Sequence, residues 1–327
     1  TDFTFVEEKK GKLFVNTPNA LAGNNISKCD TSAAKFQSEE TGLVDGIGTE
    51  DEILGKIREL VTYLPSNCED TDSYMECTDD LNRVCEDIEN CTGDTAIALS
   101  RIADNGQFFE VKADYGKSVA VGFIRLNGAT VGAVANRSES YDVEGKKVWE
   151  SDGTLSARGA RKAAEFVKFC DAFEIPVLTL TNVNGFKATV CGEKMMAKSV
   201  GALVHAFADA TVPKVNVVIG KAFGTAYTAM NSKAIGADMV YAWENAEIGM
   251  MDADLAAKIM YAGDDAAALT EKAAEYRELQ NSVSSAAARG YVDTIISPAD
   301  TRKYVIGAFE MLFTKREERP SKKHGTV

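Results

Sequence analysis

The residues whose types and spacing best suit chemistry form the turn Gly224-Thr225-Ala226. This turn joins an apolar strand expected at residues 215–219 to a helix expected at residues 226–235. The first amides of a helix have no internal acceptors and carry the positive end of its dipole, and small residues let an oxygen approach them closely. Amides placed in this way stabilise an enolate or a tetrahedral oxyanion by roughly 3 to 4 kcal/mol per donor.

A second glycine turn, at residues 181–186, follows the strand expected at residues 176–180. Ligand sites in α/β proteins gather at the carboxyl ends of neighbouring strands, so the two turns predict one shared cleft. Each turn alone would be explained equally well by ordinary turn geometry, because glycine tightens strand-to-helix connections and Asn-Gly is a common turn pair.

Other catalytic chemistry finds little support. His205 falls in an apolar helical stretch and His324 in a basic tail, so histidine triads and HExxH sites are not expected. The seven cysteines are odd in number and show no CxxC pair, which argues against a disulfide scaffold or a zinc ribbon. Cys170 follows the apolar pattern of a helix and is expected in the core.

The composition limits both partners and location. With 327 residues, 45% of them hydrophobic, the chain can bury one large core or two medium ones. A formal net charge of -13 argues against binding to nucleic acids or anionic membranes. The chain shows no apolar stretch of membrane-spanning length and no signal-peptide pattern, so a cytoplasmic protein is expected.

One pattern occurs twice, at residues 42–47 and 290–295. The first copy precedes a helix that opens with a capping box from Thr49 to Glu52, and the second precedes a helix capped at Ser297. We interpret the copies as the same element of two homologous lobes. The Gly224 turn lies 66 residues before the second copy, whereas 41 residues precede the first, so the equivalent turn of the first lobe is expected before residue 1.

An acidic stretch with few apolar residues, 66–80, predicts a surface crossing between the lobes, with their boundary near residues 66–92. Its carboxylates lack the spacing and the glycine of an EF-hand, so no metal site is predicted. These carboxylates are Glu69, Asp70, Asp72, Asp79 and Asp80.

The second lobe alternates between strand and helix patterns, which predicts a layered α/β fold. Strands are expected at residues 119–126, 130–135, 176–180 and 215–219, and helices at residues 156–173, 193–208 and 226–235.

These segments resemble the carboxyltransferase subunits, α or β, of biotin-dependent acyl-CoA carboxylases and sodium-pumping acyl-CoA decarboxylases, of the propionyl-CoA carboxylase, glutaconyl-CoA decarboxylase and methylmalonyl-CoA decarboxylase types. The resemblance covers nearly the whole chain and rests on residues 63–67, 79–83, 108–111, 122–128, 131–136, 169–173, 210–215, 221–224, 236–238 and 241–243. It implies an α/β fold of two crotonase or ClpP-like ββα superhelix lobes. Residues 1–90 would hold a first lobe truncated at its amino end plus the crossing, and residues 91–327 the second lobe.

In that family the first lobe holds the enolate of an acyl-CoA thioester and the second holds the ureido oxygen of biotin. The resemblance therefore implies a biotin-dependent carboxyltransferase that moves a carboxyl group between an acyl-CoA and biotin through backbone-amide oxyanion holes. By position, the amides belong to Gly224, Thr225 and Ala226, the biotin site to Val183, Asn184, Gly185, Phe186, Asn136 and Arg137, and the acyl pocket to Thr228.

Three positions depart from the family pattern. Residues 224–226 replace Gly-Gly-Ala, residues 184–186 replace Pro-Gly-Phe, and Thr228 replaces an aspartate of the acyl pocket. An amide at Thr225 serves as a donor provided that its backbone dihedrals suit a β-branched residue. The change at Thr228 leaves the acyl-chain preference open.

The resemblance also implies partners. Residues 194–196, Lys-Met-Met, are not the Ala-Met-Lys-Met biotin attachment sequence, so biotin is expected on a separate carboxyl carrier protein. A biotin carboxylase or a membrane decarboxylase subunit would complete the system, the latter placing the protein at the periphery of a membrane complex. A homo-oligomer is expected, with the cleft between subunits and no metal, and this chain alone would be an incomplete enzyme.

Two alternatives stay open. A crotonase-type enoyl-CoA hydratase or isomerase would need an acid or base carboxylate, for which Glu244 and Glu247 are candidates. A non-catalytic assembly fragment is the other. Neither the acyl-CoA nor the direction of transfer follows from the sequence.

Overall fold

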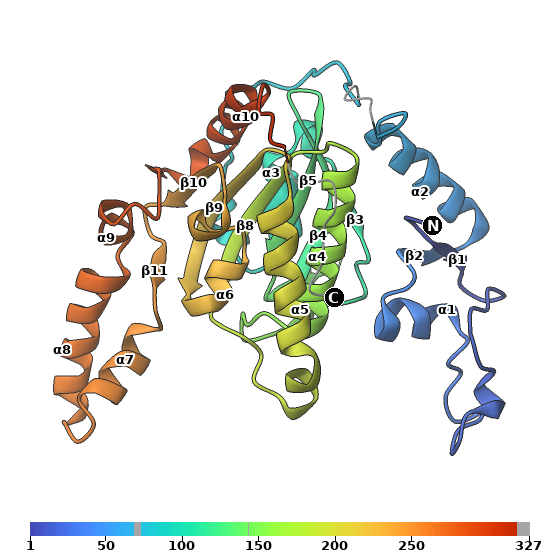
Figure 1. Cartoon of the computed structure of the whole chain (residues 1–327), viewed down its shortest axis with the longest axis horizontal. Coiled ribbons are helices and arrows are strands. Elements are labelled where there is room, and N and C mark those ends of the chain that lie inside the picture. Colours follow the sequence, from blue (N-terminus) through green and yellow to red (C-terminus); the bar gives the residue numbers. More distant parts are fainter. Residues whose placement is uncertain (69–72, 143, 319–327) are drawn as a thin grey trace.

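The computed structural model describes residues 1–68, 73–142 and 144–318, and its body is an α/β sandwich (Figure 1). Within the described residues the central sheet has eight strands, in the order β12-β10-β9-β8-β5-β4-β3, with β11 paired to β9. These strands are β3 (Phe108–Val111), β4 (Val119–Leu126), β5 (Ala129–Asn136), β8 (Val177–Val183), β9 (Lys214–Phe223), β10 (Met239–Trp243), β11 (Glu247–Gly249) and β12 (Thr294–Ile296).

The strands from β5 to β12 pair in parallel, whereas β3, β4 and β5 are antiparallel neighbours. All eight residues of β4 are buried. Strands covered on both faces by helices carry continuous apolar runs, which explains why these segments show little alternation in the sequence.

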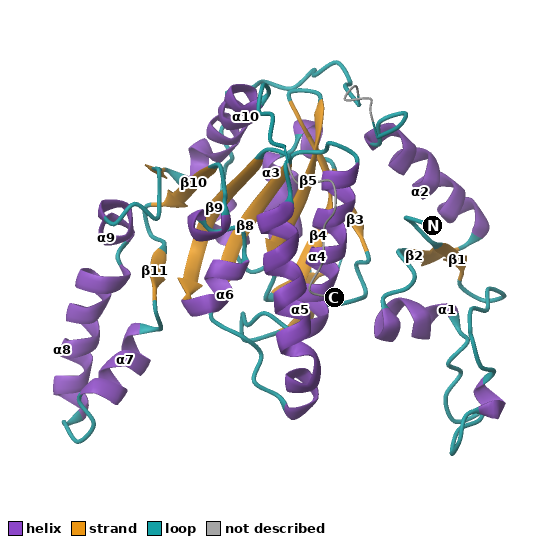
Figure 2. Ribbon diagram, viewed as in Figure 1, coloured by secondary structure: helices purple, strands orange, loops and turns teal. Residues whose placement is uncertain are grey.

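Helices cover both faces of the sheet (Figure 2). One face packs against α4 (Ala157–Ala172), α5 (Val190–Asp209) and α6 (Gly224–Ala229), and the other against α3 (Thr95–Ile102) and α10 (Thr301–Leu312). As predicted, Cys170 is buried in the core on the α4 face, and His205 lies within α5. Among the described residues, no helix has both the length and the apolar character that crossing a bilayer requires.

Two groups of elements project from opposite sides of this body (Figure 1). One group comprises α7 (Ala253–Met260), α8 (Ala266–Tyr276) and α9 (Val283–Ala288). The other comprises β1 (Phe5–Glu7), α1 (Ala34–Phe36), β2 (Gly46–Gly48) and α2 (Glu50–Tyr63). The hairpin of β6 (Glu139–Tyr141) and β7 (Lys147–Glu150) stands apart from the central sheet.

The repeated sequence pattern forms the same hydrogen bonds in both places. The amide of Asp45 donates to the Thr4 carbonyl at 2.8 Å, and its Oδ2 accepts from the Thr4 amide at 2.6 Å. The amide of Asp293 donates to the Val240 carbonyl at 2.8 Å, and its Oδ2 accepts from the Val240 amide at 2.8 Å. The strands that meet there, β1 with β2 and β10 with β12, are parallel in both cases. The division at residues 90 and 91 stays a prediction.

The helices that follow the two copies of the repeat differ in how far their apolar side chains are buried. The capping box of Thr49 and Glu52 is present at the start of α2, as expected. Counted from the repeated glycines, Ile57 of α2 matches Val305 of α10. The side chain of Val305 is 0% exposed, but that of Ile57 is 37% exposed and that of Val61 is 64% exposed. The apolar stripe of α2 is therefore partly open to solvent, since Leu60 is buried but Ile57 and Val61 are exposed, whereas α10 packs on the sheet.

The helix predicted at residues 226–235 is wrong in length, because α6 ends at Ala229. Asn231 takes a left-handed conformation with φ of 53°, which ends the helix, and a short 3₁₀ turn follows at Lys233–Ile235. The strand predicted at residues 176–180 runs on to Val183, because the hydroxyl of Thr181 is satisfied inside the core by a 2.8 Å bond to Asn216.

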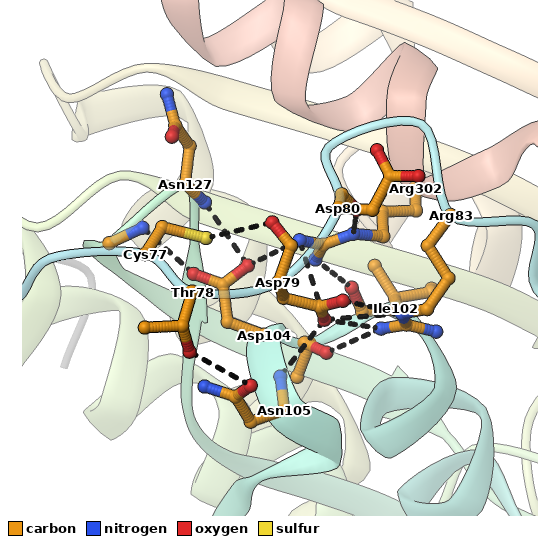
Figure 3. A network of polar contacts seen from close by, with 12 residues as sticks. Cys77, Thr78, Asp79, Asp80, Arg83, Ile102, Asp104, Asn105, Asn127 and Arg302 are labelled. Carbon is orange, nitrogen blue, oxygen red and sulfur yellow. Dashed lines mark hydrogen bonds and ion pairs between the residues drawn. The ribbon is translucent and has the colours of Figure 1, made fainter.

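The predicted surface crossing is joined to a buried polar network (Figure 3). Arg302 of α10 is 0% exposed and donates to Asp104 Oδ1 at 2.6 Å. Its guanidinium also lies 3.6 Å from Asp79 Oδ2, and Asp79 accepts from Arg83 at 2.9 Å. Asp104 Oδ2 in turn accepts from the amide of Gly128 at 2.8 Å. The crossing is therefore attached to the body of the protein by charged groups, and most of its described residues are exposed, as predicted.

Within the described residues, no group of three or more histidine, cysteine or carboxylate side chains could hold a metal ion. Of the carboxylates weighed as calcium ligands, Asp79 belongs to the network above, and Glu69, Asp70 and Asp72 lie outside the described residues. His324 also lies outside them.

Candidate functional site

The three segments singled out in the sequence follow three adjacent parallel strands. Asn136 ends β5, Val183 ends β8 and Phe223 ends β9. In the register of the sheet, Ala135 pairs with Leu180, and Val183 pairs with Ala222. The predicted loops therefore lie along one edge of the sheet, where parallel strands present their carboxyl ends.

Asn182 connects these three strand ends, and sequence reasoning did not select it. Its amide donates to Asn136 Oδ1 at 3.2 Å, and its Oδ1 accepts from the Lys221 amide at 3.0 Å. Its Nδ2 donates to the Thr92 carbonyl at 3.1 Å. A Cβ on Gly220 would lie 2.6 Å from Asn182 Oδ1, so the glycine makes room for this side chain. The sequence signal was an asparagine near the carboxyl end of an apolar strand.

A cavity of about 490 Å³ opens at this edge of the sheet. Its lining includes Asn182, Asn184, Gly220 and Lys221 at the strand ends, together with Asp152 from a neighbouring loop. Amide and charged groups dominate this lining, so it suits a polar ligand. Of the predicted residues, Asn184 and the candidate carboxylate Glu247 line this cavity, whereas the turn at residues 224–226 lies outside its lining.

The Gly224 turn has a backbone shape that suits glycine. Gly224 adopts φ of 62°, in the left-handed region, and directly follows β9. A Cβ at this position would lie 3.2 Å from the carbonyl oxygen of Met250. Both the conformation and the close neighbour therefore disfavour a side chain at Gly224.

The residues after Gly224 form the first turn of α6, where amides have no intrahelical acceptor. Thr225 is exposed and does not have a positive φ, so a β-branched side chain is tolerated there. Ala226 is buried. Thr228, one turn further on, turns its hydroxyl back to the Gly224 carbonyl at 3.5 Å.

The loop after β8 is held by a neighbouring segment of the chain. The Asn184 amide donates to the Gly153 carbonyl at 2.9 Å, and its Nδ2 donates to the Asp152 carbonyl at 2.8 Å. The carbonyl of Gly185 accepts from Leu155 at 2.8 Å. Phe186 also forms an isolated parallel bridge with Leu155. These bonds give the loop a defined shape although Asn184 is exposed.

Asn136 and Arg137 are adjacent but differ in what they can offer. Asn136 is buried, and its Nδ2 has no hydrogen-bond partner among the described residues. Arg137 is also buried, and its guanidinium pairs with Glu110 at 3.0 and 3.1 Å and donates to the Lys117 carbonyl at 3.2 Å. The guanidinium of Arg137 is therefore already paired within the protein, whereas Nδ2 of Asn136 has no partner among the described residues.

Tyr227 follows the Gly224 turn and points its ring into the core. Its hydroxyl is buried and has no hydrogen-bond partner among the described residues. Burial, reinforced by Tyr291, raises the pKa of Tyr227 to about 12. The phenol is therefore neutral at physiological pH and is not a base for the chemistry of this turn.

The carboxylates weighed for hydratase chemistry are placed differently. Glu244 is exposed after β10. Glu247 lies on β11, and its Oε2 is 3.5 Å from the guanidinium of Arg277. Glu247 also lines the cavity at the strand ends, so it remains the candidate carboxylate for hydratase chemistry, whereas Glu244 lies outside that lining.

The chain matches the family model of the carboxyl transferase domain over residues 1–327. It is 35% identical to the propionyl-CoA carboxylase, carboxyltransferase subunit, of Haloferax mediterranei, and 34% identical to the methylmalonyl-CoA decarboxylase subunit alpha of Propionigenium modestum. Each alignment covers 100% of this chain and 65% of the relative. The crystal structure of the transcarboxylase 12S hexamer, solved with hydrolysed methylmalonyl-CoA, matches with a TM-score of 0.89 and 35% identity, over 100% of this chain and 64% of the other.

An α/β lobe with a glycine turn at the start of a helix, together with these matches, defines the class of protein. The chain belongs to the carboxyl transferase domain family. The expected crotonase-type α/β fold is confirmed by the match to transcarboxylase 12S. The chain spans about two thirds of the length of the relatives that it matches.

Proposed function

We propose that the protein moves a carboxyl group between an acyl-CoA and biotin carried on a separate protein, and that this chain supplies the biotin side of the site. The observation that carries the proposal is the Gly224 turn, which places the first amides of α6 at the carboxyl edge of the sheet. Membership of the carboxyl transferase family and the names of the relatives support it.

The amides of Thr225 and Ala226 would donate to the ureido oxygen of biotin. The negative φ of Thr225 and the small side chain of Ala226 fit this role, because neither obstructs the approach to the amides. Biotin, when bound, supplies the ureido nitrogen that carries the carboxyl group. The donors are backbone groups held by a strand and a helix, so they need no reorganisation as charge develops on the oxygen.

The neighbouring loops would complete the biotin site. Asn136 offers a buried Nδ2 without a hydrogen-bond partner among the described residues, and Asn184 lines the cavity at the strand ends. Val183, Gly185 and Phe186 would contribute the shape of the loop beside the ring. For Arg137 we propose a supporting role, because its guanidinium is paired with Glu110.

The relatives named above suggest the substrate class and the partners. They are named for propionyl-CoA and methylmalonyl-CoA, so we propose a short-chain acyl-CoA, with Thr228 facing the acyl group. A biotin carboxyl carrier protein would deliver biotin, and a biotin carboxylase or a membrane decarboxylase subunit would set the direction. The transcarboxylase 12S hexamer supports a homo-oligomer, for which we propose a cleft between subunits and a cytoplasmic location.

The test is transfer of the carboxyl group from methylmalonyl-CoA to free biotin by the whole protein. Gly224→Ala should lower kcat by about 100-fold, because a Cβ narrows the approach to the amides and strains the turn. Gly290→Ala is the matched control. Gly290 has φ of 79° but no atom within 4 Å of its would-be Cβ, so this variant carries the backbone strain alone.

Equal losses from both variants would assign Gly224 a structural role only. If the whole protein hydrated an enoyl-CoA without biotin, crotonase-type chemistry would replace the proposal. Absence of transfer in the complete assembly would leave a non-catalytic assembly role.

A further inference from the structure

The segment that follows β11 forms one wall of the Gly224 turn. β11 pairs in parallel with β9, and Gly249 lies beside Phe223. The next residues of the two segments, Met250 and Gly224, therefore lie side by side. The Met250 carbonyl oxygen lies 3.2 Å from the position that a Cβ on Gly224 would take. The ion pair of Lys221 and Asp252, at 3.7 Å, joins the same two segments. Displacement of residues 249–252 would therefore change the approach to the first amides of α6.

Asn281 contacts this segment through its side chain. Its side chain is 0% exposed, and its Nδ2 donates to the Met251 carbonyl at 2.9 Å. Its Oδ1 has no hydrogen-bond partner among the described residues and lies over Gly249, where a Cβ would overlap it. A buried amide with an unpaired oxygen is costly, so packing alone would favour an apolar residue at this position.

The turn that presents Asn281 contacts the same strand at two further points. Residues Arg277–Asn281 form a single π-helical turn, a rare element that is frequent at functional sites. Arg277 lies 3.5 Å from the carboxylate of Glu247, and Glu247 forms an antiparallel bridge with Ser282. Three contacts thus fix the strand-to-loop segment 247–252 on this turn.

The first lobe contains the equivalent attachment. Lys12 forms an antiparallel bridge with Ala33, and its amine pairs with Asp30 at 2.6 Å. Both copies therefore contain one antiparallel bridge and one ion pair. The bridging residue is the cation Lys12 in the first copy and the anion Glu247 in the second. The asparagine contact over a glycine is what the second lobe adds, beside the Gly224 turn.

We propose that Asn281 is a positioning residue, whose side chain holds residues 249–252 against the Gly224 turn and so sets the access to the amides of Thr225 and Ala226. The effect on turnover rests on the proposed function. The effect on the segment itself rests on the geometry alone.

The test is a double-mutant cycle of Asn281→Ala and Gly249→Ala in the whole protein, read first by hydrogen exchange of residues 249–252. Asn281→Ala should speed exchange of this segment about tenfold, equivalent to one lost hydrogen bond. Gly249→Ala should do the same, because its Cβ displaces the asparagine amide. In the Asn281→Ala background, Gly249→Ala should add less than about twofold, since the displaced group is gone.

The second readout is carboxyl transfer from methylmalonyl-CoA to free biotin. Asn281→Ala should lower kcat about tenfold and leave the KM for methylmalonyl-CoA within about twofold, because positioning rather than binding is lost. Gln280→Ala is the matched control: Gln280 belongs to the same turn but is exposed and bonds Arg289. Neither readout should change in this variant.

Unchanged exchange in Asn281→Ala, or additive effects of the two substitutions, would overturn the inference. Loosened exchange with unchanged kcat would also overturn it, since the segment would then not control access. If the wild-type protein transfers no carboxyl group, the proposed function fails, and the exchange cycle still decides whether Asn281 holds the segment.

Discussion

Lys162 of α4 is a cation buried inside the lobe, with 1% of its surface exposed. Its amine donates to the carbonyls of Tyr115 and Lys112, at 2.7 and 3.0 Å. Desolvation lowers the pKa of Lys162 to about 7, an effect that Glu110 opposes and that Arg137 and Lys112 reinforce. A neutral amine keeps two N–H groups, which is enough for both hydrogen bonds.

This lysine predicts a pH dependence of stability. In the unfolded chain a lysine has a pKa of about 10.4, so between about pH 7 and pH 10 the unfolded state binds a proton that the folded state lacks. The free energy of unfolding of the wild type should therefore rise with pH over this range, relative to Lys162→Met. Urea unfolding of both proteins at pH 7 and pH 9 measures the difference. Parallel pH profiles would show that Lys162 stays charged in the folded state.

The network around Arg302 shows how elements are joined. Arg302 comes from α10, and Asp104 from the short turn after α3. Asp104 also accepts from the amides of Asn127 and Gly128, in the turn between β4 and β5. The side chain of Asp79, in the crossing, has its pKa lowered to about 2, chiefly by its hydrogen bonds from Arg83. Elements far apart in the chain are thus held by a few charged side chains (Figure 3).

Removing one partner of this network should lower the free energy of unfolding. Arg302→Met leaves the Asp104 carboxylate buried without its cation and should destabilise the protein by about 3 to 5 kcal/mol. The double variant with Asp104→Asn should recover part of this loss, because the uncompensated charge is gone. Arg83→Met is the control, because Arg83 is partly exposed and should cost about 1 kcal/mol or less. Chemical denaturation measures all three, and equal losses in the two arginine variants would contradict the assignment.

At the scale of the whole molecule, the helices that follow the two copies of the repeat differ in how much apolar surface they expose to solvent. Val61 of α2 is 64% exposed, while its counterpart Phe309 of α10 is partly buried beneath the body of the lobe. Leu54 and Ile57 extend the open stripe, with 47% and 37% of their surfaces exposed. Contiguous apolar surface of this kind marks an interface, so we expect this stripe to be covered in the assembled protein.

Val61→Glu tests that expectation. If the stripe is covered, the variant should lose about 2 kcal/mol or more of stability in the assembled protein, because a carboxylate is then buried without a partner. Val148→Glu is the matched control, since Val148 is 59% exposed on β7. Thermal unfolding and sedimentation velocity provide the measurements. Indistinguishable behaviour of the two variants would mean that the stripe stays exposed to solvent.

Contacts between residues close in sequence were predictable. The capping box of Thr49 and Glu52 needs only a three-residue separation, and the apolar runs that form β4, β5 and α4 carry their own periodicity. The placement of two glycine turns at one sheet edge followed from the parallel order of strands. The repeat was visible because both copies keep the aspartate that bonds the neighbouring strand.

The features that sequence reasoning could not supply depend on distant partners. The end of α6 is set at Asn231, whose side chain bonds Thr179 at 3.2 Å and the Val215 carbonyl at 3.4 Å. The place of Arg137 in the wall of the biotin site stays a prediction, and its ion pair with Glu110 could not be read from the sequence. Asn281 lies 57 residues beyond Gly224 in the sequence, and only the pairing of β11 with β9 brings its segment to the turn.

The sequence by itself determined the family, the elements and the turn at Gly224, because capping, periodicity and glycine conformations act over a few residues. The tertiary structure decided which polar side chains have hydrogen-bond or ion-pair partners, and which segment packs against the Gly224 turn. The physical reason is that a buried donor, acceptor or charge must find its partner wherever the fold brings one, and that partner need not lie nearby in the chain.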